Sequence, residues 1–173
     1  NNKSMDLSEL MAISPIDGRY RSKVESLAEW FSEFGFIKLR VEVEVKYYMA
    51  LTKEKVSLNF SLADAQWIKN KEIEIKHDVK AIEYFLKSKV KKPELIHFGL
   101  TSDDSNNLAY GLALQNANKI VLVPELLKLV NRLRTISKEN AGLVMLARTH
   151  GQTAVPTTLG KELTNFLVRI KKL

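Results

Sequence analysis

Two of the three histidines in this chain lie beside groups that could take part in proton transfer, and His77 is the first of them. It precedes Asp78 at the expected start of a helix, where an imidazole could titrate near neutrality and exchange a proton with a ligand. A histidine at a helix start is also often merely half exposed. The pair therefore allows a catalytic and a purely structural interpretation.

The segment of residues 147–158 has the strongest signal for chemistry. It gathers Thr149, His150 and Gln152 beside a glycine and a proline, and a helix is expected from Thr158 onward. Helix N-termini attract anions through unpaired amide donors, so a negative ligand could bind there and be protonated by His150. The alternative is a polar loop that only caps the next helix with a threonine hydroxyl.

Arg19 and Tyr20 leave a turn that Pro15 and Gly18 indicate. A guanidinium fork and a phenol hydroxyl together suit a phosphate or a carboxylate. An ordinary surface turn would have the same local sequence, so the alternative stays open.

Residues 100–107 form a further polar cluster, rich in hydroxyl, carboxylate and amide side chains. Thr101 and Ser102 could hold a carboxylate group of a ligand. The same residues are typical of the start of a helix, where they cap unpaired amides.

Composition limits the class of protein. The 173 residues include no cysteine, and the 27 basic and 20 acidic residues give a net charge of +7. No thiolate is available and no two histidines have i, i+4 spacing, so we expect no metal and no cofactor. No run approaches the ~18 apolar residues of a membrane span, and we expect a cytoplasmic protein without membrane contact. The charge indicates either a solvated surface or an anionic ligand. Scattered lysines without a zinc-finger or RNP-like motif argue against nucleic acid.

Apolar residues at three- and four-residue steps predict an all-α fold. Such stripes occupy residues 79–90, 126–136 and 159–170, and a long helix is expected to run towards Val121. Asp78 is expected to cap the first of these helices, and Pro124 suits the first turn of the second.

Two shorter segments add to this fold. Ser61 and Asp64 predict a capping box for a short helix. Residues 40–46 alternate between charged and valine residues, as a strand would, but they also fit a helical stripe, and we favour the helix.

Four segments resemble the fumarase/aspartase superfamily and, within it, the adenylosuccinate lyase family of bacterial type. They are residues 14–20, 77–86, 96–107 and 148–162. The Thr-Ser pair of the third segment and the Thr-His-x-Gln of the fourth are typical of the superfamily. Asp-Gly-Arg-Tyr in the first and His-Asp-Val-Lys-Ala in the second point to adenylosuccinate lyases.

The resemblance implies a lyase that eliminates fumarate from adenylosuccinate to give AMP, and from the succinylated carboxamide ribotide of purine synthesis. A general acid and a general base would act in an anti-elimination. His150 would be the acid, and His77 would assist by binding the substrate, with Asp78 orienting it. Arg19 and Tyr20 would hold the nucleotide phosphate. The succinyl part would be bound by Thr101, Ser102, Thr149 and Gln152.

The resemblance also implies an architecture. Residues 1–100 would form a small helical domain, and residues 101–173 the first part of a long helical bundle that pairs in a homotetramer with active sites shared between subunits. The last apolar stripe ends without a C-cap, so we expect a truncated chain. The base would lie in a serine-bearing loop beyond residue 173, and the chain alone would be inactive. Lys76 and Thr153 depart from the family pattern, and His97 is taken as structural.

Other functions remain possible at this point. Another fumarate-releasing lyase, such as argininosuccinate lyase, shares several of the superfamily features. The chain could instead be a non-catalytic nucleotide-binding fragment, or a basic helical module that binds nucleic acid.

Overall fold

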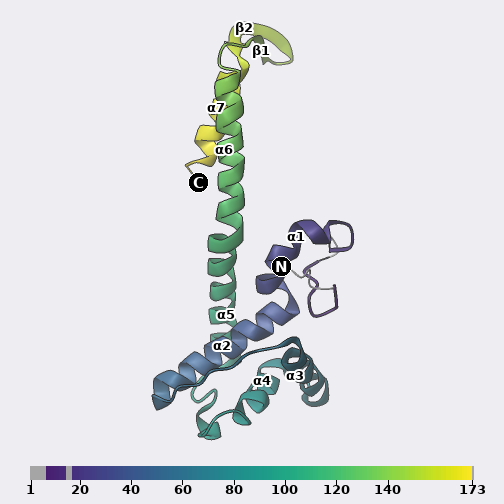
Figure 1. Cartoon of the computed structure of the whole chain (residues 1–173), viewed down its shortest axis with the longest axis vertical. Coiled ribbons are helices and arrows are strands. Elements are labelled where there is room, and N and C mark those ends of the chain that lie inside the picture. The colour runs from purple at the N-terminus through teal and green to yellow at the C-terminus, as the bar shows by residue number, and fades with distance from the viewer. Residues whose placement is uncertain (1–6, 15–16, 173) are drawn as a thin grey trace. The chain divides into compact units, whose positions relative to one another are not determined.

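The computed structural model describes residues 7–14 and 17–172, and it divides into two compact units, Asn1–Asn118 and Lys119–Leu173 (Figure 1). Pro15, which contributed to the predicted turn, lies outside the described residues. Helices make up most of both units, and the predicted all-α class is confirmed, with one small two-stranded sheet in addition. The domain boundary near residue 100 stays a prediction.

The first unit consists of helices joined by loops. Its elements are α1 (Asp17–Phe31), α2 (Glu33–Thr52), α3 (Leu62–Ile75), α4 (Asp78–Lys87), the 3₁₀ turn η1 (Pro93–Leu95) and α5 (Ser102–Ala117). The predicted capping box is present at α3, where Ser61 and Asp64 each satisfy the other's backbone amide.

Helix α2 is the central element of this unit, and the predicted helix over residues 40–46 is confirmed. It is buried along much of its surface because α1 and α5 contact it, and so do α3 and α4. Contact with four helices explains the alternation of valine and charged residues over residues 40–46. A helix covered on several sides needs apolar residues on more than one face. The main core is formed by α2, α3 and α4 around the buried side chains of Ile37, Val41, Tyr48, Ile68, Ile82 and Leu86.

Helix α4 begins differently from the expectation. His77, and not Asp78, is the N-cap residue: its Nδ1 accepts a hydrogen bond from the Lys80 amide at 3.2 Å. Asp78 is the first residue of the helix, and its carboxylate instead binds Arg40 at 2.6 Å. The prediction that Asp78 caps the helix was therefore wrong, because a buried guanidinium from α2 holds that carboxylate.

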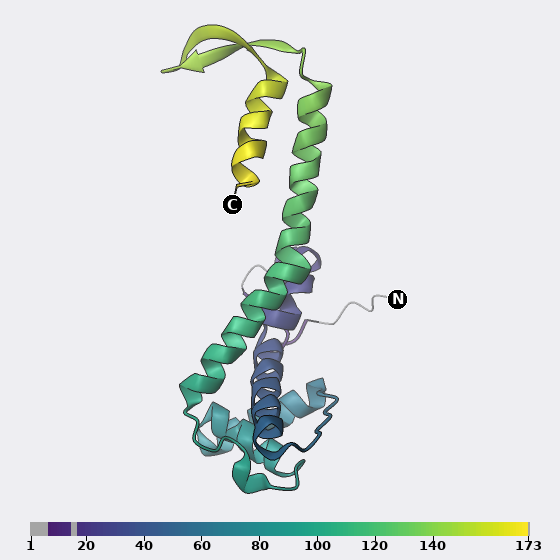
Figure 2. The same cartoon turned by 90° about the vertical axis from the view of Figure 1, so that its left-hand side faces the viewer.

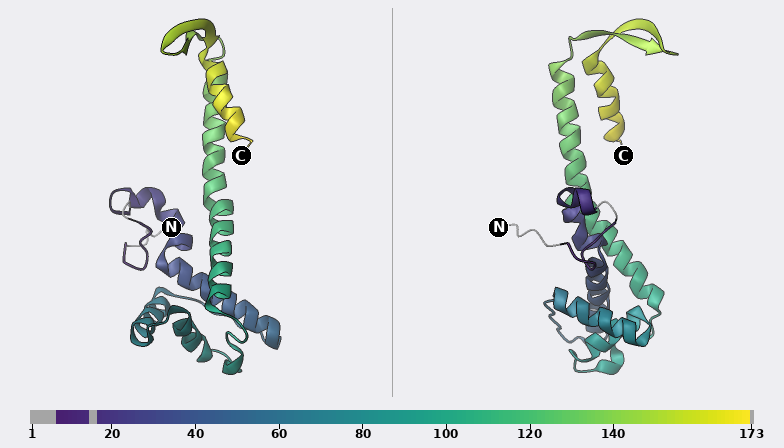
Figure 3. Two further views of the ribbon diagram at one scale, coloured as in Figure 1. Left: turned by 180° about the vertical axis from the view of Figure 1, so that it is seen from behind. Right: turned by 90° about the vertical axis from the view of Figure 1, so that its right-hand side faces the viewer.

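The second unit is a helical hairpin. The π-helical turn η2 (Asn118–Leu122) leads into α6 (Val123–Glu139), and α7 (Leu159–Ile170) runs back beside α6 (Figures 2 and 3). Pro124 lies in the first turn of α6 and Thr158 caps α7, both as predicted. Gly160 lets the two helices approach, because an added Cβ would clash with the Ser137 carbonyl and the Ala141 backbone.

The segment between these helices is a β-hairpin, and the predicted loop over residues 147–158 was wrong. Strand β1 (Val144–Thr149) pairs antiparallel with β2 (Gln152–Thr158), with an irregular register between Leu146 and Arg148. His150 and Gly151 connect the strands with φ values of 51° and 74°. Two successive residues at positive φ are what a type I′ hairpin turn requires.

No helix among the described residues is both long and apolar enough to cross a bilayer.

Candidate active site

Three of the residues singled out in the sequence line one cavity in the first unit. The cavity measures about 690 Å³ and is bordered by Glu72, Ile73, Lys76, His77, Asp78 and Ser102. Asp78 and Ser102 are the first residues of α4 and α5, so two helix N-termini reach its wall. The helix dipoles at these ends favour a negatively charged ligand.

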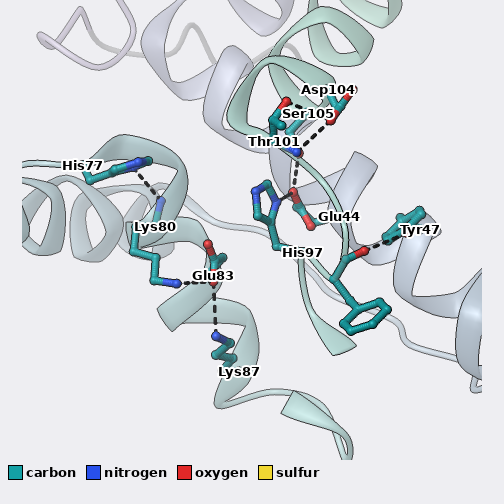
Figure 4. A network of polar contacts seen from close by, with 11 residues as sticks. Glu44, Tyr47, His77, Lys80, Glu83, Lys87, His97, Thr101, Asp104 and Ser105 are labelled. Atoms are coloured by element: carbon teal, nitrogen blue, oxygen red, sulfur yellow. Dashed lines mark hydrogen bonds and ion pairs between the residues drawn. The ribbon is translucent and has the colours of Figure 1, made fainter. Parts of the chain in front are cut away.

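His77 is held by the helix that it caps. Its Nδ1 accepts from the Lys80 amide, which leaves the ring proton on Nε2, and its side chain is 52% exposed (Figure 4). The ring therefore has one nitrogen fixed by the fold and one available to a ligand. Such an arrangement suits hydrogen bonding to a substrate oxygen.

Asp78 lies next to this imidazole, with Oδ1 3.8 Å from the His77 Nδ1 atom. Burial tends to raise the pKa of Asp78, but the Val79 amide and the Arg40 guanidinium outweigh burial and lower it. Asp78 is therefore an anion at neutral pH.

Thr101 and Ser102 lie at the start of α5. The Thr101 amide and hydroxyl donate to Asp104 Oδ2 at 2.7 and 2.8 Å, and Ser102 borders the cavity. The Thr101 side chain in turn accepts from the Asp104 amide, so the two residues form a capping box at the start of α5. Of Thr101 and Ser102, only Ser102 lines the cavity in the first unit as it stands.

Asp104 should make the start of α5 sensitive to acid. The Thr101 amide, and then its hydroxyl, hold the pKa of Asp104 below its ordinary value of 3.8. A pKa lowered by folding stabilises the protein above the unfolded value, and that stabilisation is lost as the pH falls through the folded value. We expect Asp104→Asn to lower Tm at neutral pH and to flatten the fall of Tm below about pH 4.

The adjacent, exposed Asp103 provides the matched control for this measurement. Asp103→Asn should leave the wild-type slope of Tm against pH in place. Equal slopes for wild type and Asp104→Asn would contradict the assignment.

Arg19 and Tyr20 lie in the first turns of α1, and both are exposed. The Arg19 guanidinium lies 5.4 Å from the centroid of the Tyr20 ring, so the two side chains are together as the sequence suggested. Neither borders the cavity that His77 lines. Their assignment to a phosphate stays a prediction.

His150, Thr149 and Gln152 form a separate cluster at the turn of the β-hairpin in the second unit. Thr149 pairs with Gln152 across the strands, and all three side chains are exposed to solvent. The imidazole is thus presented at the tip of a hairpin and is not sealed in apolar packing. This exposure is compatible with a proton donor, and the role itself stays a prediction.

Several residues around the cavity were not proposed as site residues from the sequence. Glu72 and Ile73 line it from α3, and Lys76, which departs from the family pattern, also borders it. Arg40 was not singled out, although a charged residue within an apolar helical stripe is a signal for a buried ion pair. Among the described residues, no group of three His, Asp or Glu side chains could bind a metal.

Comparison with known proteins decides the family. A family model described as lyase matches residues 38–172, most of the chain. The chain belongs to this lyase family, within the fumarase/aspartase superfamily. The lyase match includes the His77 cavity and the His150 hairpin.

The curated relatives of this lyase chain include adenylosuccinate lyases. Those of Haemophilus influenzae and Dictyostelium discoideum are 42% and 41% identical over 193 and 196 residues, and each comparison covers 97% of the chain. The Escherichia coli K12 adenylosuccinate lyase is 39% identical. The chain spans 42% of the length of each of these relatives. The aligned regions exceed 173 residues, so the relatives are longer than this chain within the matched region.

Solved structures show the same fold for this lyase chain. A fumarate lyase from Mesorhizobium sp. BNC1 superposes with a TM-score of 0.67 at 19% identity, covering 86% of the chain and 38% of that structure. The 3-carboxy-cis,cis-muconate lactonizing enzyme from Pseudomonas putida reaches 0.70 at 21% identity, covering 91% and 39%.

Proposed function

We propose that this protein is part of a lyase that eliminates fumarate from adenylosuccinate, giving AMP, and acts likewise on the succinylated carboxamide ribotide of purine synthesis. The observation that carries the proposal is the cavity where His77, Asp78 and Ser102 meet at two helix N-termini. The curated relatives at about 40% identity are adenylosuccinate lyases, which supports this substrate.

The chemistry requires groups that the chain provides in part. A base removes a proton from the carbon beside a carboxylate, the carbon–nitrogen bond breaks, and an acid protonates the departing nitrogen. His150 is the proposed acid, because its exposed imidazole can approach a leaving group. The proposed base lies in the serine-bearing loop expected outside these 173 residues.

The remaining residues would bind the anionic substrate. Arg19 and Tyr20 would hold the phosphate, and His77, oriented by Asp78, would bind the substrate within the cavity. The proposed succinyl-binding groups are Thr101, Ser102, Thr149 and Gln152. Fixed donors of this kind stabilise the charge that develops on the carboxylate as the proton leaves.

The assembly is a proposal as well. We infer a cytoplasmic homotetramer whose active sites are shared between subunits. Exposed apolar side chains on both helices of the second unit support a partner there; they include Leu126, Leu127, Leu129, Phe166 and Val168. Sharing of sites would allow the His150 hairpin of one subunit to complete a cavity of another.

An assay of fumarate release tests the proposed function. The full-length protein, purified and supplied with adenylosuccinate, should produce fumarate, seen as a rise in ultraviolet absorbance of the released acid or by a coupled malate assay. Argininosuccinate serves as the control substrate and should give no fumarate. Turnover of argininosuccinate in place of adenylosuccinate would show that the substrate is wrong.

A further inference from the structure

Two charged side chains of α2 are buried, and neither of them lines the cavity described above. The Arg40 side chain is 3% exposed and that of Glu44 is fully buried. They are four residues apart, so they project from the same face of the helix. Arg40 Nη1 donates to Asp78 Oδ2 at 2.6 Å, and its guanidinium lies 4.2 Å from the centroid of the Phe36 ring. Arg40 thereby connects α2 to the start of α4.

Glu44 connects the same face of α2 to the start of α5. Its Oε1 accepts from His97 Nδ1 at 2.6 Å and also from the Ser105 hydroxyl (Figure 4). His97 lies in the loop before α5, and Ser105 is the fourth residue of α5. One carboxylate oxygen of Glu44 thus binds both the loop before α5 and the first turn of α5, on either side of Thr101 and Ser102.

The loop that Glu44 holds has a strained backbone. His97 and Gly99 have φ values of 59° and 73°, and a left-handed conformation is unfavourable at a non-glycine residue such as His97. One turn further along α2, the Tyr47 hydroxyl donates to the Phe98 carbonyl at 2.8 Å. Helix α2 therefore fixes this loop through two successive turns, immediately before the residues that enter the cavity.

Stability does not account for these buried charges. Within the described part of the chain, Glu44 Oε2 and Arg40 Nε are buried without a hydrogen-bond partner. An unpaired buried polar atom costs stability, and apolar residues of similar size often replace buried ion pairs without loss. What an apolar residue could not do is hold Asp78, His97 and Ser105 in fixed orientations.

We propose that Arg40 and Glu44 are positioning residues for the proposed lyase reaction. Arg40 fixes the start of α4 with His77 and Asp78, and Glu44 fixes the start of α5 with Ser102. Together they set the spacing of the two cavity walls. This inference rests on the proposed function, and neither residue touches the substrate.

Kinetics of apolar variants of the full-length enzyme test the proposal. We expect Arg40→Met to raise KM for adenylosuccinate about tenfold, because His77, oriented by Asp78, is the proposed substrate-binding group. Glu44→Leu should lower kcat about tenfold, because orientation of the succinyl group is lost; both effects lie below the ~10²-fold that a 1 Å misplacement can cost. Arg40→Lys and Glu44→Gln, which keep a donor or an acceptor in place, should restore most of each loss and should also fold if the apolar variants do not.

The same helix offers matched controls. Glu42 and Lys46 carry the same kinds of charge, pair with each other at the surface, and have side chains 38% and 64% exposed. Glu42→Leu and Lys46→Met should leave kcat and KM within twofold of wild type. If Arg40→Met and Glu44→Leu also stay within twofold, or if their only defect is a lower fraction of folded protein, the positioning role is wrong.

Backbone hydrogen exchange separates this inference from the proposed function. Arg40→Met should speed exchange of the amides of residues 78–81, and Glu44→Leu that of residues 97–105, with the rest of the unit unchanged. This readout needs no substrate. If wild type releases no fumarate but the local exchange changes appear, the substrate assignment fails, while the structural link of Arg40 and Glu44 to the starts of α4 and α5 stands. Uniform or absent changes in exchange overturn that link and, with it, the positioning role.

Discussion

Replacing His150 with asparagine should reduce fumarate release by the full-length enzyme by about 10²–10⁴-fold, the range that general acid catalysis contributes. Asparagine is the informative substitute because position 150 has a φ of 51°, and the Asn-Gly pair that it would form with Gly151 is the preferred type I′ turn. The hairpin should therefore persist while the proton donor is lost. Turnover of adenylosuccinate at saturation is the measurement.

A comparison of His150→Asn with His150→Ala separates chemistry from backbone effects. Alanine tolerates positive φ poorly, so it adds strain to the turn that asparagine does not. If the imidazole is the acid, both variants should lose activity to a similar extent. A much smaller loss for asparagine, below about fivefold, would remove the proton-donor role and leave the turn as the cause.

The polypeptide of residues 1–173 should release no measurable fumarate by itself, even at concentrations where the full-length protein consumes all substrate. These residues provide the proposed acid and the binding groups, whereas the proposed base lies outside them. The exposed apolar side chains of α6 and α7 must also be buried against a partner before the second unit could hold His150 in a fixed position. Fumarate production over hours, compared with a buffer blank, is the measurement.

A circular dichroism measurement is the control for this prediction. The same polypeptide should retain its helical circular dichroism signal, so that inactivity does not reflect an unfolded sample. Fumarate release at a rate that scales with polypeptide concentration, and that survives further purification, would mean that the base lies among these residues.

Local rules predicted the helices well, since each depends on residues close in sequence. The capping box of Ser61 and Asp64, the proline in the first turn of α6 and the Thr158 cap are all present. Residues 40–46 show where such rules become ambiguous. Their alternation suits a strand, and the helix that α2 forms was favoured because the same residues fit a helical stripe, with helices on both sides and no partner strand.

The hairpin of residues 144–158 shows where the sequence analysis failed. A two-residue turn ending in glycine, between segments with alternating Val144, Leu146, Thr153 and Val155, was a usable signal. The glycine and Pro156 were instead interpreted as marks of an irregular loop. A proline is tolerated here because both strands of a two-stranded sheet are edges.

The sequence predicted which residues belong to the candidate site better than it predicted which of them lie together. Polar residues beside turns and helix starts identified His77, Asp78 and Ser102, but their shared cavity depends on how α3, α4 and α5 pack around α2. Arg40 and Glu44 were missed for the same reason. Which face of α2 is buried, and what it contacts, is set by elements up to 61 residues away in sequence.

Gly160 limits the substitutions that the second unit can tolerate. At this position the backbone of α7 meets the end of α6, with its amide donating to the Asn140 carbonyl at 3.0 Å and no room for a methyl group. Any substitution must push the two helices apart at the point from which both hairpin strands emerge. A residue without a side chain is thus required at this position, and a substitution there would displace every group that the hairpin carries.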